Sequence, residues 1–281
     1  MAFGSGQPLL TGSQIKALAI ALPADRTEQD RIAAVIDDAD TLIDSLEQLL
    51  TKQRQIKQGA MQELLTGKRR LPGFDAAWEQ RSLSELADIR SGGTPSTSQP
   101  ALWDGGLPWC TPTDITALVG QKCLSNTERT ISAAGLQDSS AELLPVGTVV
   151  MTSRATIGEC AIASVPMTTN QGFKNFVPKA STDGEFLYYL LTTQKQGFLA
   201  LCSGSTFLEI GKRQLVDFRV TVPAETTEQQ AIAQVLTDID TAITALQARL
   251  TKARELKQAL MQVLLTGRIR LLPPGAAARP A

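Results

Sequence analysis

Apolar residues recur every three or four positions in two long stretches of the chain, a spacing typical of helices that pack lengthwise on one another. The first stretch contains Ile32, Val35, Ala39, Leu42, Leu46, Leu49, Ile56 and Ala60, and the second Ile232, Val235, Ile239, Ala242, Leu246, Leu256 and Leu260. A second row widens the apolar stripe and consists of Ile36, Ile43, Leu50, Leu236, Ile243 and Leu250. We therefore expect two long helices that pack on each other. Because the apolar stripe is wider than one seam, we also expect another protein surface to pack on these helices.

The two stretches are copies of one sequence. Glu28–Leu71 aligns without a gap on Glu228–Leu271, 200 positions later, and 24 of the 44 paired residues are identical. This interval is much longer than the solenoid period of about 20 to 50 residues. The repeat is therefore a duplicated helix with another segment between its copies.

Both copies carry signals for the ends of a helix. Thr27–Asp30 and Thr227–Gln230 have the spacing of a capping box at the N-terminus. Gly67 and Gly267 stand where a residue in the left-handed region would end the helix, with a proline shortly beyond. A helix between these signals would be roughly 57 Å long at about 1.5 Å per residue, too long for the interior of a compact domain of this size.

Charge predicts the relative direction of the two helices. Each copy is acidic in its first half and basic in its second half. The helix macrodipole explains only part of this bias, which extends beyond the terminal turns. In an antiparallel pair the acidic half of the first helix would face Arg249, Lys252, Arg254 and Lys257, whereas a parallel pair would oppose like charges. We therefore predict an antiparallel coiled coil.

Residues 72–223, between the helices, have a different character. Gly, Pro, Ser and Thr separate short β-rich runs, of which the clearest are 144–151, 158–163 and 218–222. Two shorter helices are predicted at Leu83–Ile89 and Glu185–Leu201. Three tryptophans, Trp78, Trp103 and Trp109, are expected to anchor a small core. The predicted fold class is α+β, with one mixed α/β domain and two long helices.

Composition excludes several classes of protein. The chain has no histidine, which removes Ser-His and Cys-His catalysis, mixed zinc sites and the commonest general base. Its four cysteines include no C-x-x-C pair, so we expect small thiols rather than a zinc site or disulfides. There is no signal-peptide pattern and no apolar run of about 18 residues for a membrane span. We expect a soluble cytoplasmic protein without a cofactor, a metal or catalytic residues.

The order of several motifs resembles the DNA-specificity subunit of Type I restriction-modification systems. These motifs are Gly92–Ser96, Trp103–Trp109, Ser153–Arg154 before Ile157–Gly158, Thr169–Phe173, and Pro223–Gln229 before a helix that ends Leu-Leu-Thr-Gly. The resemblance covers essentially the whole chain. It implies a non-catalytic subunit in which target-recognition domains each read half of an interrupted site in double-stranded DNA. It also implies that methyltransferase subunits dock around two antiparallel helices. The endonuclease subunit would then join the complex through the methyltransferase subunits.

The resemblance also divides the chain into segments. These are 1–23, the tail of a first recognition domain; 24–71, a conserved helix; 72–223, the target-recognition domain; 224–272, the second conserved helix; and 273–281, a disordered tail. The family normally carries a complete recognition domain before the first helix, whereas Gly4–Pro23 resembles only its tail and corresponds to Gly204–Pro223. Three explanations remain open: a half-subunit that forms a homodimer, a truncated product, or a cassette that exchanges its recognition domain by recombination.

Charge limits how strongly the middle domain alone could bind DNA. Residues 72–223 hold 11 basic and 14 acidic residues, a net charge of −3, whereas autonomous DNA binding leaves a basic footprint. We expect weak affinity for the chain alone, with partner subunits neutralising most phosphates while this domain supplies base readout.

Base-reading side chains are expected in four loops, 91–97, 111–114, 153–156 and 170–174, which offer hydroxyl, amide and basic groups. Turn chemistry is the alternative interpretation of each loop. The candidate DNA-binding residues are Ser91, Gly93, Thr94, Thr111, Thr113, Ser153, Arg154, Gln171 and Lys174. Arg154 is the strongest because it is a long bidentate donor. The candidate helix-interface residues are Ile32, Val35, Leu42, Leu46, Leu49, Ile232, Val235, Ile239, Leu246 and Leu256.

Two functions of other classes are weighed against DNA recognition. A structural adaptor whose middle domain binds protein would suit the acidic balance. A methyltransferase is suggested faintly by Asn170–Phe173, which is similar to the base-holding motif of adenine methyltransferases but lacks its two prolines. Ser91–Pro95 is not a phosphate-binding loop, because the lysine and the helix that should follow are missing.

Overall fold

The computed structural model describes residues 11–202 and 208–271. The chain forms two compact units. The helix unit contains the residues up to Arg54 and from Thr241, and the mixed unit is Gln55–Asp240. The tail expected at 273–281 lies outside the described residues. No helix in the part of the chain that the structure describes is long and apolar enough to cross a membrane.

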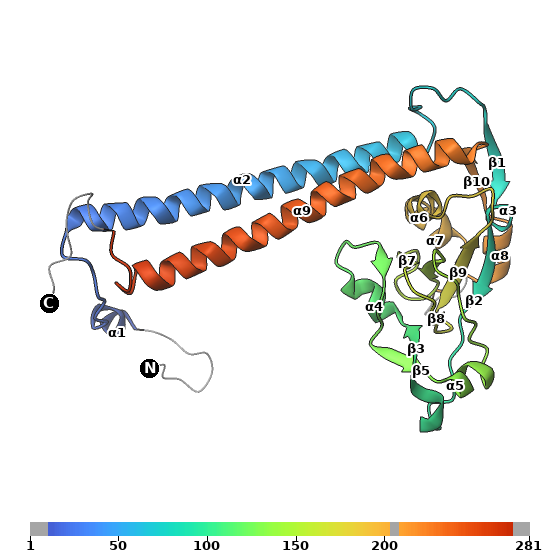
Figure 1. Cartoon of the computed structure of the whole chain (residues 1–281), viewed down its shortest axis with the longest axis horizontal. Helices are drawn as coiled ribbons and strands as arrows, with labels where there is room; N and C mark the ends of the chain where they lie inside the picture. The colour runs from blue at the N-terminus through green and yellow to red at the C-terminus, as the bar shows by residue number, and fades with distance from the viewer. Residues whose placement is uncertain (1–10, 203–207, 272–281) are drawn as a thin grey trace. The chain divides into compact units, whose positions relative to one another are not determined.

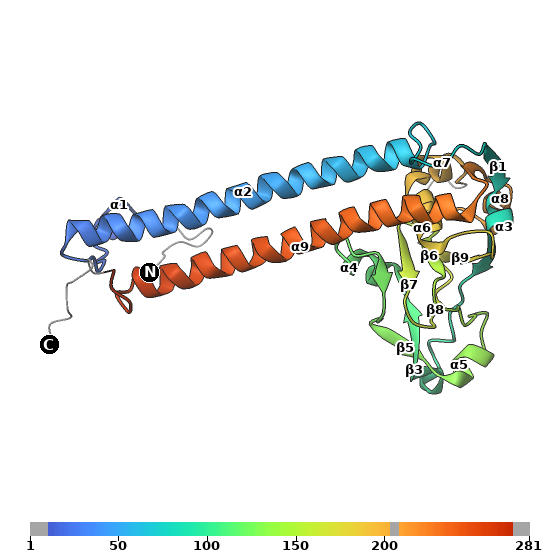
Figure 2. The same ribbon diagram turned by 45° about the horizontal axis from the view of Figure 1, so that its top comes forward.

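The two copies of the repeat form the long helices α2 (Arg26–Leu64) and α9 (Thr226–Leu264), each of 39 residues. They run antiparallel, side by side in both views (Figures 1 and 2), which confirms the direction predicted from charge. In the helix unit, Arg254 donates to Glu47 over 2.6 Å, and Lys257 forms an ion pair with Asp40. Complementary charge thus opposes the acidic half of α2 with the basic half of α9.

The helix ends follow the sequence signals in part. Gly67 and Gly267 have φ angles of 70° and 71°, as predicted for the C-terminal caps. The N-terminal cap predicted at Thr27 was wrong, because α2 begins at Arg26, one residue before it. The backbone N–H of Thr27 donates to Asp25 Oδ1 over 2.9 Å. Asp25 is therefore the N-terminal cap. Thr227 likewise lies inside α9, which begins at Thr226.

The seam of the helix unit runs mainly through the second apolar row. Its buried cluster consists of Leu46, Leu50, Leu246, Leu250 and Ala253, with Ile43 and Ile243 packed against it. Of the candidate interface residues, Ile32, Leu46, Ile232 and Leu246 are buried, Val35, Val235 and Ile239 are half-buried, and Leu42, Leu49 and Leu256 are exposed. The last three, at 46%, 41% and 55% exposure, therefore lie outside the seam.

The mixed unit contains three sheets. A two-stranded antiparallel sheet pairs β1 (Trp78–Ser82) with β10 (Arg219–Pro223). The five-stranded sheet has the order β2 (Ala87–Ser91), β9 (Phe173–Pro178), β6 (Val149–Thr152), β7 (Cys160–Ala163), β4 (Cys123–Leu124), and only its β7–β4 pair is parallel. The three-stranded sheet has the order β5 (Arg129–Ile131), β3 (Trp103–Cys110), β8 (Thr168–Thr169), with β3 and β8 parallel.

Short helices connect these strands. They are α3 (Leu83–Leu86), η1 (Pro100–Leu102), α4 (Pro112–Ala117), α5 (Ala133–Gln137), α6 (Gly184–Thr193), α7 (Lys195–Ala200) and α8 (Lys212–Val216), while α1 (Gly12–Lys16) belongs to the helix unit. The helix predicted at 83–89 stops at Leu86, because the chain turns into β2 and pairs with β9. The helix predicted at 185–201 is divided at Gln194 into α6 and α7.

Helix ends close the main core of the mixed unit. Phe186, Leu187 and Leu190 of α6 are buried in one cluster with Ile232 and Leu236 of α9. Leu64 and Leu65, at the end of α2, belong to the same cluster. The two-stranded sheet, part of the five-stranded sheet and the helix ends within this unit therefore share one hydrophobic core, while strands of the three-stranded sheet contribute to two further buried clusters.

Replacing both Leu46 and Leu246 with Asp should break the seam of the helix unit, because each change places an unpaired charge among buried leucines. We expect a loss of at least about 3 kcal/mol. Circular dichroism should show loss of helix at a lower temperature, while fluorescence of the tryptophans, which all lie in the mixed unit, should still report folded surroundings. The matched control is the double change Leu42→Asp and Leu49→Asp on the exposed row. Equal melting of the two double variants would contradict this seam.

Candidate nucleic-acid interface

The four loops that the sequence singled out are joined to one another in the structure. We call loops 91–97, 111–114, 153–156 and 170–174 the loop set. Three backbone hydrogen bonds make the connections: Gly93 N to Thr169 O (2.9 Å), Asn170 N to Cys110 O (2.9 Å) and Ser153 N to Gly172 O (2.7 Å). Segments that follow β2, β3 and β6 are thus held against the turn that precedes β9. Polar groups far apart in the sequence gather in one region of the mixed unit.

Packing accounts for the glycines of the first loop. A Cβ atom on Gly92 would lie 1.9 Å from the carbonyl oxygen of Asn170, and one on Gly93 would lie 2.3 Å from the backbone nitrogen of Ala141. Both positions therefore require glycine for close backbone approach. Next to them, the Thr94 hydroxyl donates a hydrogen bond to the amide oxygen of Gln171. This contact pairs two candidate base-reading side chains.

A tryptophan pair supports the first loop. The rings of Trp103 and Trp109 meet edge to face, with centroids 4.9 Å apart. The indole N–H of Trp103 donates to the carbonyl of Ser96 over 3.0 Å, and that of Trp109 donates to the carbonyl of Gly93 over 2.9 Å. Both rings are buried in a small cluster with Ile131, as expected for core anchors. The same rings hold the backbone of a candidate base-reading loop.

The second loop is fixed by a helix cap. Asp114 Oδ2 accepts hydrogen bonds from both the backbone N–H and the hydroxyl of Thr111, each over 2.7 Å, at the start of α4. Its Oδ1 accepts from the backbone N–H of Glu128 over 2.8 Å. The backbone N–H and the hydroxyl of Thr111 are therefore both engaged in the helix cap, as the alternative turn interpretation of this loop expects. Residues 112–114 of this predicted loop form the first turn of α4, in which Thr113 is exposed.

Arg154 and Lys174 have different surroundings. Arg154 Nε lies 2.9 Å from Glu209 Oε2, and both side chains are partly exposed. Lys174 is buried, with Nζ 3.5 Å from Ser153 Oγ and 3.3 Å from the carbonyl of Phe173. Burial lowers the pKa of Lys174, an effect that the Glu209 carboxylate opposes. Arg154 thus has an acidic neighbour that sequence reasoning did not identify, because Glu209 lies 55 positions away.

Two buried polar side chains, those of Thr169 and Asn175, lie on either side of the turn before β9 and are hydrogen-bonded to each other. Asn175 Nδ2 donates to the hydroxyl of Thr169 over 2.8 Å, while among the described residues Asn175 Oδ1 has no hydrogen-bond partner. Ser91 lies opposite Lys174 in the β2–β9 register.

In residues 11–202 and 208–271, no group of three or more cysteine and acidic side chains is placed to hold a metal ion.

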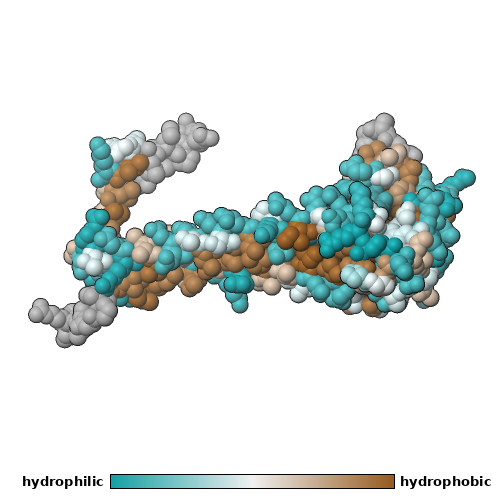
Figure 3. Space-filling model, turned by 90° about the horizontal axis from the view of Figure 1, so that it is seen from above, coloured by the Kyte–Doolittle hydropathy of each residue, from teal (hydrophilic) through white to brown (hydrophobic). Residues whose placement is uncertain are grey.

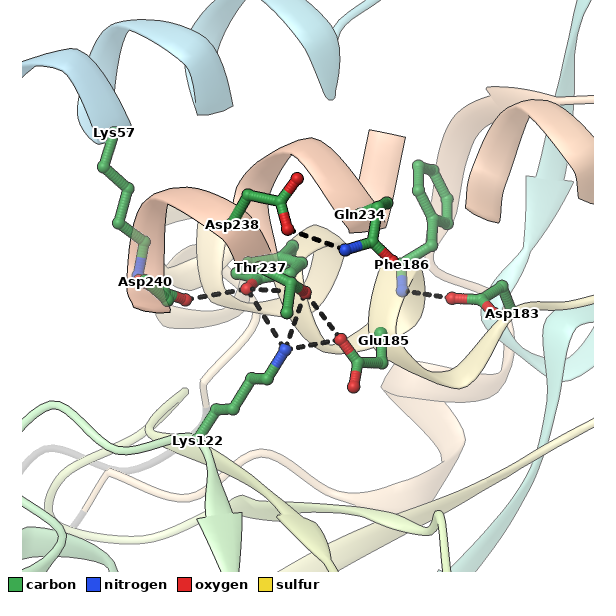
Figure 4. A network of polar contacts seen from close by, with 10 residues as sticks. Lys57, Lys122, Asp183, Glu185, Phe186, Gln234, Thr237, Asp238 and Asp240 are labelled. Carbon is green, nitrogen blue, oxygen red and sulfur yellow. Dashed lines mark hydrogen bonds and ion pairs between the residues drawn. The ribbon is translucent and has the colours of Figure 1, made fainter. Parts of the chain in front are cut away.

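A polar network, here called the helix joint, ties the sheet side of the mixed unit to the long helices (Figure 4). Lys122, just before β4, forms an ion pair with Glu185 of α6 and donates to Thr237 of α9 over 2.7 Å. Thr237 also donates to Glu185 over 2.7 Å. On α9, Asp240 accepts from the Tyr189 hydroxyl over 2.7 Å and from Lys57 of α2 over 2.6 Å.

The repeat builds the same contacts at both pairs of helix ends. In the mixed unit, Arg70 donates two hydrogen bonds to Glu228, of 2.6 and 2.8 Å. In the helix unit, Arg270 donates two to Glu28, of 2.7 and 2.6 Å. The short helices α1 and α8 also correspond, since their residues differ by 200 positions. The structural repeat therefore extends beyond the long helices.

Burial distinguishes the two ends. In the mixed unit, Leu65, Leu215, Val220 and Val222 are at most 6% exposed. Their counterparts in the helix unit, Leu265, Ile15, Ile20 and Leu22, are 50%, 56%, 75% and 67% exposed. A groove in the helix unit is lined by Leu22, Ile32, Ala33, Ile36 and Leu265, among others. We call this groove the open seat, because its counterpart in the mixed unit holds α6.

Comparison with known proteins assigns a family to this arrangement. Residues 76–256 match the model of the Type I restriction modification DNA specificity domain. The chain is 38% identical over 165 residues to the Type I restriction enzyme MjaIX specificity subunit of Methanocaldococcus jannaschii, covering 58% of this chain and 38% of that relative. It is 27% identical over 187 residues to the EcoR124I/EcoR124II specificity subunit of Escherichia coli, covering 64% and 45%. The chain thus spans less than half the length of either relative.

Solved structures share the fold. A chain from a study of complex assembly and conformational transition of the type I R-M system has a TM-score of 0.61 and 22% identity, covering 95% of this chain and 66% of that one. The HsdS subunit from Thermoanaerobacter tengcongensis has a TM-score of 0.54 and 21% identity, covering 95% and 65%. The two long helices and the mixed domain are therefore a known combination.

The helix joint should be sensitive to acid. Burial opposes ionisation of Glu185, but hydrogen bonds from Lys122 and Thr237 outweigh it and keep its pKa below the ordinary value of 4.5. A lowered carboxyl pKa stabilises the folded state above the ordinary pKa, and this contribution is lost as the pH falls through the folded value. Because Glu185 is partly exposed, we expect Lys122→Met to cost no more than about 1 kcal/mol at pH 7.

The difference between the wild type and Lys122→Met should shrink as the pH falls below 4.5, which thermal melts followed by tryptophan fluorescence can measure. Lys179→Met is the matched control, because its exposed ammonium lies 3.8 Å from Asp88 outside the joint. A pH-independent difference for Lys122→Met would contradict the assigned ionic contribution.

Proposed function

The chain belongs to the Type I restriction-modification DNA-specificity family, and from this premise we propose that it reads a DNA half-site for a complex whose chemistry resides in other subunits. The observation that carries the proposal is the loop set, in which hydroxyl, amide and basic side chains converge on one region of a domain of this family. Such side chains match the donor and acceptor pattern of base edges in the major groove. Residues 72–223 would form the target-recognition domain, between conserved helical segments 24–71 and 224–272.

The helices would serve as the docking element for methyltransferase subunits, through which the endonuclease subunit would join. Leu42, Leu49 and Leu256 support this proposal, because they are exposed although their row has helical spacing. Apolar side chains gather along the helices on the face drawn in Figure 3. Exposed apolar patches of this kind are typical of protein interaction surfaces.

Electrostatics support a division of labour between this chain and its partners. The domain's net charge of −3 and the Arg154–Glu209 ion pair both disfavour tight binding of phosphates by the chain alone. The acidic balance also favours the second candidate function, a protein-binding adaptor. A mobility-shift assay with the methyltransferase partner distinguishes the DNA reader from the adaptor. If the chain is a DNA reader, a sequence-specific shift of the DNA requires its presence, whereas an adaptor would not be required for that shift.

The open seat supports a reader with two recognition domains. It repeats the chemistry of the mixed-unit end, including the bidentate contact of Arg270 with Glu28, yet leaves Ile20, Leu22 and Leu265 exposed. A second recognition domain placed there would bury these side chains, as α6 and the sheets bury their counterparts in the mixed unit. A second copy of this chain, or a different specificity protein, could supply that domain.

Exchanging residues 74–222 for the equivalent segment of a relative should change the DNA sequence that the complex methylates. Assembly with the methyltransferase should be retained, because the proposed reading and docking elements lie in separate segments. Methylome sequencing measures the motif, and co-purification measures assembly. An unchanged motif in an assembled, active complex would show that the middle domain is not the reader.

A complete reader made only from copies of this chain should recognise an interrupted palindrome. Twofold symmetry of the protein imposes inverted copies of one half-site, separated by a fixed spacer. Inserting one heptad into each long helix should lengthen the spacer or abolish recognition. Sizing of the complex and methylation mapping are the measurements. An asymmetric motif would indicate a second, different specificity protein, and the absence of methylation would favour a truncated product or a recombination cassette.

A further inference from the structure

Arg129 differs from most basic residues of the middle domain because it forms no ion pair with a described carboxylate. Six of the 11 basic residues in 72–223 form such an ion pair: Arg81 with Glu79, Arg90 with Glu142, Lys122 with Glu185, Arg154 with Glu209, Lys179 with Asp88, and Lys195 with Glu159. Of the other five, Lys174 is buried and Lys212, Arg213 and Arg219 lie on α8 and β10. Arg129 is exposed on β5.

The tryptophan pair holds the Arg129 side chain in place. Its guanidinium carbon lies 3.7 Å from the ring centroid of Trp103 and 5.4 Å from that of Trp109. An arginine stacked on an indole keeps its in-plane N–H groups available for hydrogen bonds. The stacking also restricts a long side chain before any ligand binds, which lowers the entropy cost of binding.

Arg129 is held directly against the loop set. It pairs with Trp109 in the β5–β3 register, and the Trp109 indole supports the loop 91–97 through the carbonyl of Gly93. The preceding residue, Glu128, donates its backbone N–H to Asp114 of the loop 111–114. Two of the four candidate base-reading loops are therefore connected to the Arg129 segment by hydrogen bonds.

We propose that Arg129 binds a DNA phosphate beside the bases that the loop set reads, an assignment that rests on the proposed DNA-reading function. The planar guanidinium matches a phosphate bidentately, and β5 is an edge strand of its sheet rather than a loop tip. Neutral donors and acceptors such as Thr94 and Gln171 suit base edges but give little electrostatic attraction. A rigid cation next to them sets the register of the loops on the duplex.

The test uses the complete complex with its methyltransferase subunit and a duplex carrying the motif that methylome sequencing assigns to the wild type. Arg129→Gln should weaken binding about tenfold near 0.1 M salt and reduce the slope of log affinity against log salt by about 1, the values expected for one lost phosphate contact. The methylated motif should stay the same. Arg219→Gln is the matched control, because it removes an exposed cation from β10, outside the Arg129 segment and the loop set, and should leave both quantities unchanged.

Three results would overturn the assignment: unchanged affinity and salt slope in Arg129→Gln, an equal loss in Arg219→Gln, or a changed methylated motif, which would make Arg129 a base reader. If Arg129→Gln fails to fold, as judged by tryptophan fluorescence and melting, Arg129→Lys decides. The lysine keeps the charge but loses bidentate geometry, so binding should weaken severalfold at an unchanged slope, and wild-type affinity would overturn the assignment. Failure of the proposed function itself is distinct, because the wild-type complex would then show no preference for any motif.

Discussion

A buried carboxylate at the start of α9 constrains the rest of the structure. The Glu228 side chain is only 2% exposed, and Arg70 compensates its charge with two hydrogen bonds while the indole of Trp78 approaches it as well. Breaking such a pair by removing one partner costs about 3 to 5 kcal/mol. The contact therefore fixes the end of α2 beside the start of α9, which makes the helices antiparallel and brings both ends of the middle domain together.

Features set by local rules could be predicted from the sequence. The left-handed residues Gly67 and Gly267 were identified because few residues other than glycine adopt positive φ, and the helix direction followed from charges repeated along each copy. The seam could be predicted only in part. Two apolar rows have helical spacing, and which row faces the partner depends on the rotation of the packed helices. Leu42 and Leu49 are exposed for this reason.

The candidate site shows the same limit. Its loops were located because turn residues interrupt β-rich runs, but their assembly depends on hydrogen bonds between distant segments. The guanidinium of Arg154 is paired with the carboxylate of Glu209. The orientation of Arg129 depends on Trp103, 26 positions earlier. Neither relationship has a periodic signal in one sequence. Likewise the helix predicted at 83–89 was shortened by β2, because pairing with β9 outweighs the local helical preference.

The duplicated contacts also indicate what the second recognition domain of the proposed reader would supply at the open seat. The polar part of the seat is already complete within this chain, since Arg270 compensates Glu28 and Gln29 donates to the carbonyl of Pro23 over 2.7 Å, as Gln229 does to Pro223 over 3.1 Å. An incoming domain therefore need not desolvate an unpaired charge. Its affinity would come mainly from burying apolar groups such as Leu22 and Leu265, each worth about 1.5 to 3 kcal/mol when fully buried. Because those groups are hydrophobic, they would select a partner by shape rather than by its DNA-reading residues, so in the proposed two-domain reader different recognition domains would fit the same seat.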